Sequence, residues 1–183
     1  MNINVYDNSF MLINSPDLSR GGDYMANEIQ LVVFTLKQGD MICEYGVSIT
    51  KVHEIITMTK PTKLPQAPEF VEGIINLRGK IIPIIDLKKR FQMGASDFTS
   101  ETRSVVVEVA GQTVGIIVDE VSEVLRLSED NIEPAPTIVG GIAADYLTGV
   151  GKIDGRLLVL LDMDKILSEG ERAELVSVGG QEE

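Results

Sequence analysis

The sequence predicts an all-β protein with a few short helices, and three observations lead to this prediction. Isoleucine and valine outnumber alanine in the apolar stretches, and β-branched side chains favour strands. Ten short apolar segments are separated by turn-forming residues, a pattern typical of β-barrels and sandwiches. Finally, the second half of the sequence resembles the first, which indicates a duplicated unit.

The ten apolar segments are expected to be strands because each is short and most are bounded by residues that form turns. The first runs from Ile29 to Leu36 and is followed by Lys37-Gln38-Gly39-Asp40. The other nine are Met41–Val47, Val52–Thr57, Gly73–Leu77, Lys80–Ile85, Ser104–Val109, Thr113–Val118, Val121–Leu127, Tyr146–Ile153 and Arg156–Leu161.

Helices are expected at three places. Leu87–Phe91 and Met163–Leu167 each follow an apolar strand and an aspartate, Asp86 or Asp162, whose carboxylate can accept hydrogen bonds from the first backbone N–H groups of a helix. The segment Glu169–Val176 has helix-forming composition and is followed by two glycines, so it predicts a short C-terminal helix.

The duplication is most evident around two turns. The segment Gly73–Phe91 aligns without gaps against Gly149–Leu167, and both contain a turn glycine, a basic residue, an apolar run and a capping aspartate. Further upstream, Gly46–Ile56 pairs with Gly115–Leu125. The repetition favours two similar small β-barrels related by a pseudo-twofold axis. Each copy, at roughly 60 residues, would have a marginal core, so a hydrophobic seam between the copies is expected.

The domain boundaries follow from this pattern. Residues 1–27 have no sustained periodicity and predict a flexible leader. Residues 28–177 form the expected domain, with one copy at about 29–91, the second at about 103–167 and the helix at about 169–176. Residues 178–183 predict a flexible tail.

Charge and composition exclude several classes of partner. Acidic residues exceed basic ones by 28 to 16, giving a formal charge of −12, so nucleic acid and anionic membranes are unfavourable partners. No apolar run reaches the roughly 18 residues of a membrane span, and no signal peptide is recognisable, so no direct membrane insertion and a cytoplasmic location are expected. The single cysteine, Cys43, cannot form an intramolecular disulfide.

The sequence offers little for catalysis, so no enzyme activity, cofactor or metal is expected. His53 is the only histidine, which excludes a histidine-rich metal site and favours an ordinary strand histidine. Asp86, Asp119 and Asp162 follow apolar strands, and capping of a helix or turn is the simpler account of each. No phosphate-binding loop is present. An enzyme that uses these aspartates, or a β-barrel that binds a small molecule, would instead need a polar pocket.

A candidate binding residue lies at a predicted hairpin tip. In Asn76-Leu77-Arg78-Gly79-Lys80, Gly79 can supply the positive φ of a tight turn and thereby expose Arg78. The simpler interpretation is that Arg78 is an ordinary surface residue. The alternative is an interface anchor, because a guanidinium offers several planar donors and arginine is enriched at binding hot spots.

Several ordered motifs together resemble the CheW family of chemotaxis adaptors. They are Val-His-Glu-Ile at Val52–Ile55, Gly-Ile-Ile-Asn-Leu-Arg-Gly-Lys-Ile-Ile-Pro-Ile-Ile-Asp-Leu at Gly73–Leu87, Gly-Ile-Ile-Val-Asp-Glu-Val at Gly115–Val121 and Tyr-Leu-Thr-Gly-Val-Gly at Tyr146–Gly151. The resemblance covers about Glu28 to Val176. It implies two five-stranded, SH3-like β-barrels around a shared hydrophobic core.

The resemblance also implies partners and a binding site. It implies an adaptor without enzymatic activity, monomeric in isolation, that binds the cytoplasmic tips of methyl-accepting chemotaxis receptors and the regulatory domain of the histidine kinase CheA. The kinase-binding residues cannot be matched to motif positions. The implied receptor-binding residues are Val52, Glu54, Asn76, Leu77, Arg78, Ser104, Val105 and Val107.

Two related proteins share this architecture. The regulatory domain of CheA would carry kinase segments before the duplicated region, and a CheV-type fusion would need a receiver domain after it. Neither is found in this sequence, so a free-standing adaptor is expected.

Overall fold

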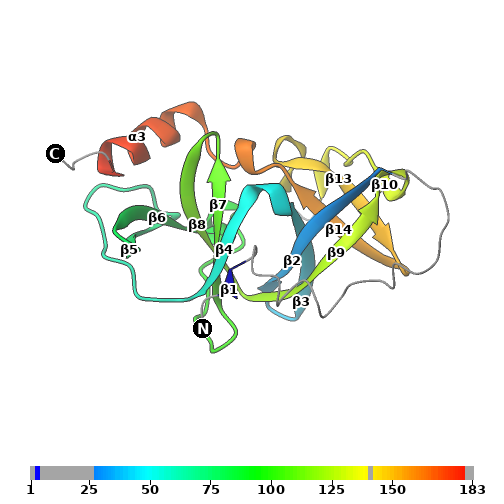
Figure 1. The fold of residues 1–183 in the computed structure, drawn as a ribbon, viewed down its shortest axis with the longest axis horizontal. Helices are drawn as coiled ribbons and strands as arrows, with labels where there is room; N and C mark the ends of the chain where they lie inside the picture. Colours follow the sequence, from blue (N-terminus) through cyan, green and yellow to red (C-terminus); the bar gives the residue numbers. More distant parts are fainter. Residues whose placement is uncertain (1–2, 5–26, 140–141, 180–183) are drawn as a thin grey trace.

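The computed structural model describes residues 3–4, 27–139 and 142–179, and within these it is mostly β-structure with few helices (Figure 1). All ten predicted strands are confirmed. They are β2 (Glu28–Gln38), β3 (Met41–Ser48), β4 (Val52–Thr57), β5 (Val71–Leu77), β6 (Lys80–Asp86), β7 (Arg103–Val109), β8 (Gln112–Val118), β9 (Glu120–Ser128), β13 (Leu147–Ile153) and β14 (Arg156–Leu161).

Four further strands have only two residues each, too short to show a periodicity in sequence. They are β1 (Ile3–Asn4), β10 (Ile132–Glu133), β11 (Ile138–Val139) and β12 (Ile142–Ala143). The expected flexible leader and tail lie largely outside the described residues.

The helical segments are short apart from the last. They are η1 (Ile49–Lys51), α2 (Leu87–Arg90), η2 (Glu129–Asn131), η3 (Ala144–Tyr146), η4 (Met163–Lys165) and α3 (Glu169–Gly179). The helix expected over Met163–Leu167 is thus a single 3₁₀ turn, and the C-terminal helix extends three residues beyond its predicted end.

The strands form two six-stranded mixed sheets. Sheet A has the order β1-β4-β7-β8-β6-β5, and sheet B has the order β10-β13-β14-β3-β2-β9, while β11 and β12 form a separate pair. Each large sheet contains one parallel pair, β6 with β8 in sheet A and β14 with β3 in sheet B. Neither strand order closes on itself, so among the described residues these sheets are not hydrogen-bonded barrels.

Each sheet combines strands from both copies of the duplicated sequence. The first copy supplies β2 and β3 to sheet B but β4, β5 and β6 to sheet A. The second copy supplies β7 and β8 to sheet A but β9, β13 and β14 to sheet B. The equivalent strands occupy equivalent places in the two sheets, which supports the pseudo-twofold relation inferred from sequence.

The largest hydrophobic cluster contains residues of both sheets, as the expected seam requires. Its aromatic side chains form a continuous row in which Phe34 stacks on Tyr45, Tyr45 contacts Phe91 and Phe91 contacts Tyr146, with ring centroids 5.8, 6.2 and 5.9 Å apart. Smaller clusters lie within each sheet, around Leu160 in sheet B and Ile84 in sheet A. Burial of this apolar surface is the main force that joins the two sheets.

The duplicated glycines have a steric explanation. Gly73 has a φ of +144°, and a Cβ atom at this position would lie 2.1 Å from the carbonyl oxygen of Thr62. Its counterpart Gly149 is also crowded, because a Cβ atom there would lie 2.7 Å from the carbonyl oxygen of Glu133. Both positions therefore need a residue without a side chain.

Two of the three conspicuous aspartates are helix caps, as predicted. Asp86 accepts hydrogen bonds from the backbone N–H groups of Lys88 and Lys89, and Asp162 accepts one from that of Asp164. For Asp119 the capping prediction was wrong, because its carboxylate instead accepts from the distant Lys37 N–H at 2.6 Å. The reason is topological: β8 and β9 are joined directly at Asp119, where the chain passes from sheet A to sheet B.

Candidate functional site

The hairpin between β5 and β6 carries the predicted tip residue in a strained conformation. Arg78 and Gly79 form the two-residue turn with φ values of +52° and +85°, the geometry of a type I′ turn. The Asn76 side chain stabilises the turn by accepting a hydrogen bond from the Gly79 N–H at 2.8 Å. A positive φ is unfavourable for arginine. Contacts made by the Arg78 side chain offset this conformational cost.

Those contacts come from Glu54 on β4. Two guanidinium nitrogens of Arg78 donate to the two carboxylate oxygens of Glu54 at 2.7 and 2.9 Å. This bidentate, charge-assisted geometry is the strongest arrangement of such a pair. The Glu54 side chain is only 7% exposed, whereas that of Arg78 is 61% exposed. Glu54 therefore anchors the arginine, whose remaining donors and planar face are presented to solvent.

The ion pair between a hairpin arginine and a glutamate on a neighbouring strand, here called a clasp, also occurs in sheet B. Glu123, which aligns with Glu54 in the duplicated sequence, accepts a hydrogen bond from Arg156 on the β13–β14 hairpin at 2.9 Å. Arg156 follows the turn glycine rather than preceding it, and it also donates to Glu44 at 3.1 Å. An arginine thus fixes a hairpin to a neighbouring strand in both sheets, although Arg156 aligns with Lys80 in the duplicated sequence and Arg78 aligns with Asp154. Arg156 still provides a control for Arg78 on the other sheet.

The structure brings the other predicted receptor-binding residues close to this clasp. On the hairpin, Asn76 is exposed and Leu77 is half-buried. The remaining four lie on the adjacent strands β4 and β7 and are buried in the described structure: Val52, Ser104, Val105 and Val107. Three of them, all valines, belong to the large hydrophobic cluster. Their role at a binding face stays a prediction, and in this conformation only the hairpin residues are accessible.

The only histidine lies beside this site without contributing to it. His53 is exposed at a register shift between β4 and β7, and its Nε2 lies 3.8 Å from a carboxylate oxygen of Glu108. This agrees with the expected ordinary strand histidine. Among the described residues, no three His, Cys, Asp or Glu side chains are placed to hold a metal ion together.

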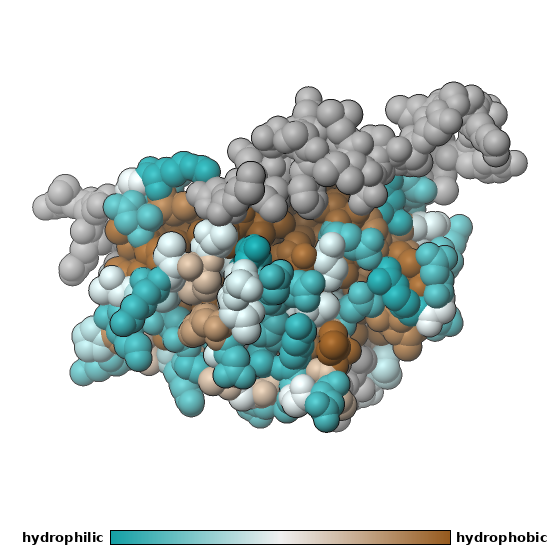
Figure 2. All heavy atoms as spheres, turned by 90° about the horizontal axis from the view of Figure 1, so that it is seen from below, coloured by the Kyte–Doolittle hydropathy of each residue, from teal (hydrophilic) through white to brown (hydrophobic). Residues whose placement is uncertain are grey.

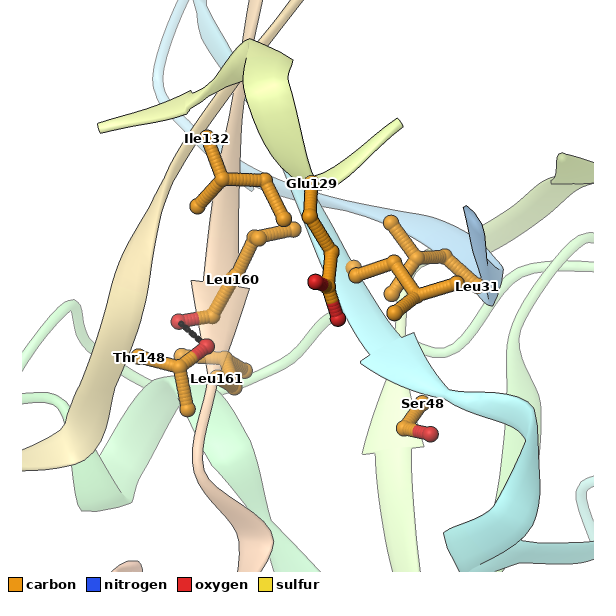
Figure 3. Close-up of a pocket in the computed structure, with 9 residues that line it drawn as sticks. Leu31, Ser48, Glu129, Ile132, Thr148, Leu160 and Leu161 are labelled. Carbon is orange, nitrogen blue, oxygen red and sulfur yellow. Dashed lines mark hydrogen bonds between the residues drawn. The ribbon is translucent and has the colours of Figure 1, made fainter. Parts of the chain in front are cut away.

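A shallow hollow of about 450 Å³ opens on sheet B (Figure 3). It is lined mainly by apolar side chains, including Leu31, Ile132 and Leu160, with the carboxylate of Glu129 among them. The hydroxyl of Thr148 at its edge donates to the carbonyl of Leu160 at 3.4 Å. Besides Glu129, the polar side chains in its lining are those of Ser48 and Thr148.

An exposed apolar patch lies where β3 and β14 begin, and sequence reasoning did not identify it. Met41, Ile42 and Leu157 are each more than 60% exposed. β14 runs parallel to β3 with Val159 opposite Tyr45, so the two strands begin close together, and Arg156 joins them through Glu44. Because side chains alternate along a strand, Met41 and Ile42 point to opposite faces of β3. The signal in the sequence was an apolar residue one or two positions after each turn, Met41 after Asp40 and Leu157 after Gly155. Figure 2 shows one face of the molecule, on which hydrophilic residues predominate and apolar residues are seen mainly in the upper part of the view.

Comparison with known proteins identifies a family. The family model of the CheW-like domain matches residues 30–171. Among similar proteins, the chemotaxis protein CheW of Klebsiella aerogenes is 40% identical over 144 residues, covering 79% of this chain and 84% of that protein. The chemotaxis protein CheW of Rhizobium meliloti is 36% identical over 143 residues, covering 78% and 90%.

A solved structure is similar as well. The crystal structure of the scaffolding protein TtCheW from Thermoanaerobacter tengcongensis matches with a TM-score of 0.71 and 40% sequence identity, covering 78% of this chain and 94% of that one. Separately, none of the helices in the described part of the chain is long and apolar enough to span a membrane.

Proposed function

Because the chain belongs to the CheW-like domain family, we propose that it is a chemotaxis scaffold that couples chemoreceptors to a histidine kinase. The observation that carries this proposal is the match to several chemotaxis CheW proteins over most of the chain, together with a structural match to a scaffolding member. The partners are the cytoplasmic tips of methyl-accepting receptors and the regulatory domain of CheA. The protein acts in the cytoplasm, as a monomer in isolation, without catalysis.

The finer architecture belongs to the same proposal. Each sheet contains five long strands in equivalent order and has its own small hydrophobic cluster. We infer that each is the SH3-like, five-stranded barrel expected for the family, with one additional two-residue strand at its edge.

For the receptor we propose the hairpin face that contains Asn76, Leu77 and Arg78, supported by Glu54. An exposed guanidinium held in one orientation by a buried carboxylate loses little further conformational freedom on binding. The half-buried Leu77 beside it offers apolar surface to a receptor helix, while polar groups at the rim set its register. The buried valines of β4 and β7 support this face from beneath.

For the kinase we propose the patch of Met41, Ile42 and Leu157. A scaffold that holds two partners at once needs two separate surfaces, and this patch lies on sheet B whereas the receptor hairpin lies on sheet A. Exposed apolar side chains next to charged Arg156 and Glu44 have the character of an interface core with a polar rim.

Alanine at Arg78 is expected to weaken receptor binding about 30-fold, corresponding to about 2 kcal/mol for a well-placed anchor. Binding of a receptor cytoplasmic fragment and of a CheA regulatory domain would be measured by calorimetry. Kinase binding should be unchanged, and Arg156→Ala, which removes the corresponding clasp of sheet B, should leave receptor binding within about twofold. Failure of the unaltered protein to bind either partner would refute the scaffold assignment.

An aspartate at Ile42 is expected to weaken CheA binding at least tenfold, since it places a charge in the apolar patch. Receptor binding in the same preparation should not change, which shows that the fold is intact. The exposed Thr50 lies outside the patch, so Thr50→Asp is a matched surface control. If Thr50→Asp weakens CheA binding as much as Ile42→Asp does, the kinase-binding surface is not the apolar patch.

A further inference from the structure

A second hollow, of about 470 Å³, opens on sheet A and is here called the sheet A hollow. Its lining includes Pro61 and Glu72. The hollow described above on sheet B, of about 450 Å³, is lined by Ile132 and Thr148 (Figure 3). The construction of their walls shows that the two hollows lie at equivalent places in the duplicated fold.

One wall of the sheet A hollow is fixed to β5 by backbone pairing. The N–H groups of Thr62 and Ile74 each donate to the carbonyl oxygen of the other residue, both at 2.9 Å. Pro61 is thereby held beside Gly73, where a Cβ atom would lie 3.1 Å from the Cβ atom of the proline. Glu72, which precedes this glycine, completes this part of the lining.

Sheet B repeats this construction around the other duplicated glycine. Glu133 pairs with Val150 on β13, and Ile132 is held beside Gly149, where a Cβ atom would lie 2.8 Å from the Cγ2 atom of the isoleucine. Thr148 precedes this glycine and lines the hollow on sheet B. The same pairing of a loop with a strand, beside the same glycine, therefore forms a hollow in each sheet.

The charged side chains of the two hollows differ in sign. The lining on sheet B contains the carboxylate of Glu129. The lining on sheet A contains Lys60, Lys63 and Glu72, and both lysines are exposed. The Glu72 carboxylate is paired with the ammonium of Lys89, whereas neither Lys60 nor Lys63 forms an ion pair with another residue of the described part of the chain. The sheet A hollow therefore offers two cations to a ligand.

The rest of the sheet A hollow is mainly apolar and includes Met58 and Phe98. Phe98 is 57% exposed, although phenylalanine is among the residues most often buried. Its loop is closed by two hydrogen bonds, from the Thr99 N–H to the Thr102 hydroxyl at 2.9 Å and from the Thr102 N–H to the Thr99 carbonyl at 3.2 Å. An exposed aromatic ring on a fixed loop presents apolar surface to a partner at a low cost in conformational entropy.

We propose that the sheet A hollow binds an acidic segment of a partner protein, which inserts a large apolar side chain beside Phe98 and presents carboxylates to Lys60 and Lys63. Its volume of about 470 Å³ lies within the range of about 300–1,000 Å³ found for ligand sites. Exposed charges are screened over about 8 Å at physiological ionic strength, so the two ammonium groups, rather than the overall charge of the chain, select the segment.

This site is separate from the surfaces proposed for the receptor and the kinase. Its lining contains none of the residues given to the receptor hairpin or to the apolar patch of Met41, Ile42 and Leu157. A test of the hollow needs neither the receptor nor CheA, so its result is independent of the scaffold assignment.

A labelled peptide tests the proposal on the full-length protein. The probe is the hexapeptide Glu-Asp-Leu-Phe-Glu-Asp with a fluorophore, and its binding is measured by fluorescence anisotropy at low and at physiological salt. It should bind about tenfold more tightly than Lys-Lys-Leu-Phe-Lys-Lys, which reverses the charge, and than Glu-Asp-Gly-Ser-Glu-Asp, which lacks the apolar anchor. Binding no tighter than that of either control peptide would overturn the proposal.

Substitutions then locate the bound peptide. Lys60→Gln combined with Lys63→Gln should weaken binding about tenfold and remove most of its salt dependence, and Phe98→Ala should weaken it about fivefold. Glu129→Gln, in the hollow on sheet B, is the matched control and should leave binding unchanged. The altered side chains are exposed, so the midpoint of urea unfolding should stay the same in every variant.

Two results would contradict the assignment of the occupant. If the peptide binds the lysine variant and Phe98→Ala as tightly as the unaltered protein, it binds elsewhere and the proposal is wrong. Sedimentation of the protein without peptide covers the other case: if the unaltered protein self-associates and the lysine variant does not, a second copy of the chain fills the hollow, and a partner segment does not.

Discussion

Alanine in place of Asp119 is expected to destabilise the protein by about 3–5 kcal/mol, the usual cost of breaking a buried ion pair from one side. The carboxylate lies 3.5 Å from the ammonium of Lys88, and the two side chains are 9% and 7% exposed. It also accepts the N–H of Lys37 from β2 at 2.6 Å. The substitution would therefore leave a buried ammonium and a backbone donor without partners, at the point where the chain crosses between sheets.

Urea unfolding of a small variant set can separate the two contributions. Asp119→Asn keeps an acceptor for Lys37 but removes the charge, so it should cost less than Asp119→Ala. Adding Lys88→Met to Asp119→Asn should restore part of the stability, because no buried charge is then left alone. A loss below about 1 kcal/mol for Asp119→Ala would show that solvent reaches the ion pair.

The second large effect is expected at Asp86, where alanine should cost about 3 kcal/mol or more. Besides the backbone N–H groups of Lys88 and Lys89, its carboxylate accepts from the N–H and the hydroxyl of Ser96, at 3.0 and 2.8 Å. Asp86 is buried, so the donors that lose their acceptor remain out of water, at about 1–3 kcal/mol for each unsatisfied group.

Its duplicated counterpart provides an internal comparison. Asp162 occupies the same place before η4, but its side chain is a quarter exposed and, within the described part of the chain, accepts from one backbone N–H, that of Asp164 at 3.1 Å. Asp162→Ala should therefore cost about 1 kcal/mol, the ordinary value of a helix cap. Equal losses of unfolding free energy in the two variants would contradict the role given to Ser96.

The strands could be predicted from the sequence because the residues that end each strand lie within or next to it. Turn-forming residues such as Gly39, Gly79 and Gly155 adopt positive φ where the predicted strands end, and the turn chemistry acts over only a few residues. Gly73 and Gly149 recur in the duplication because a neighbouring backbone passes too close for a side chain.

What the sequence could not supply depends on long-range pairing. The periodicity of β4 and β7 says which residues alternate, but burial of Val52, Val105 and Val107 follows from the elements packed against them. Likewise, nothing local distinguishes Asp119 from the capping Asp86, since its partner Lys37 is 82 residues away. The position of Arg78 at a hairpin tip was predicted from the turn residues. Its bidentate ion pair with Glu54, which lies 24 residues earlier, is evident only in the folded structure.

The exchange of strands between the two copies bears on the origin of this chain. A precursor with a single copy would have had β4, β5 and β6 but not the β7 and β8 against which they pair in sheet A. Two such molecules could complete both sheets only by swapping strands, forming a twofold-symmetric homodimer. Gene fusion would then join the two halves of such a dimer in one chain, after which each half could diverge. For the same reason, a protein cut between residues 91 and 103 should reassemble only when both fragments are present.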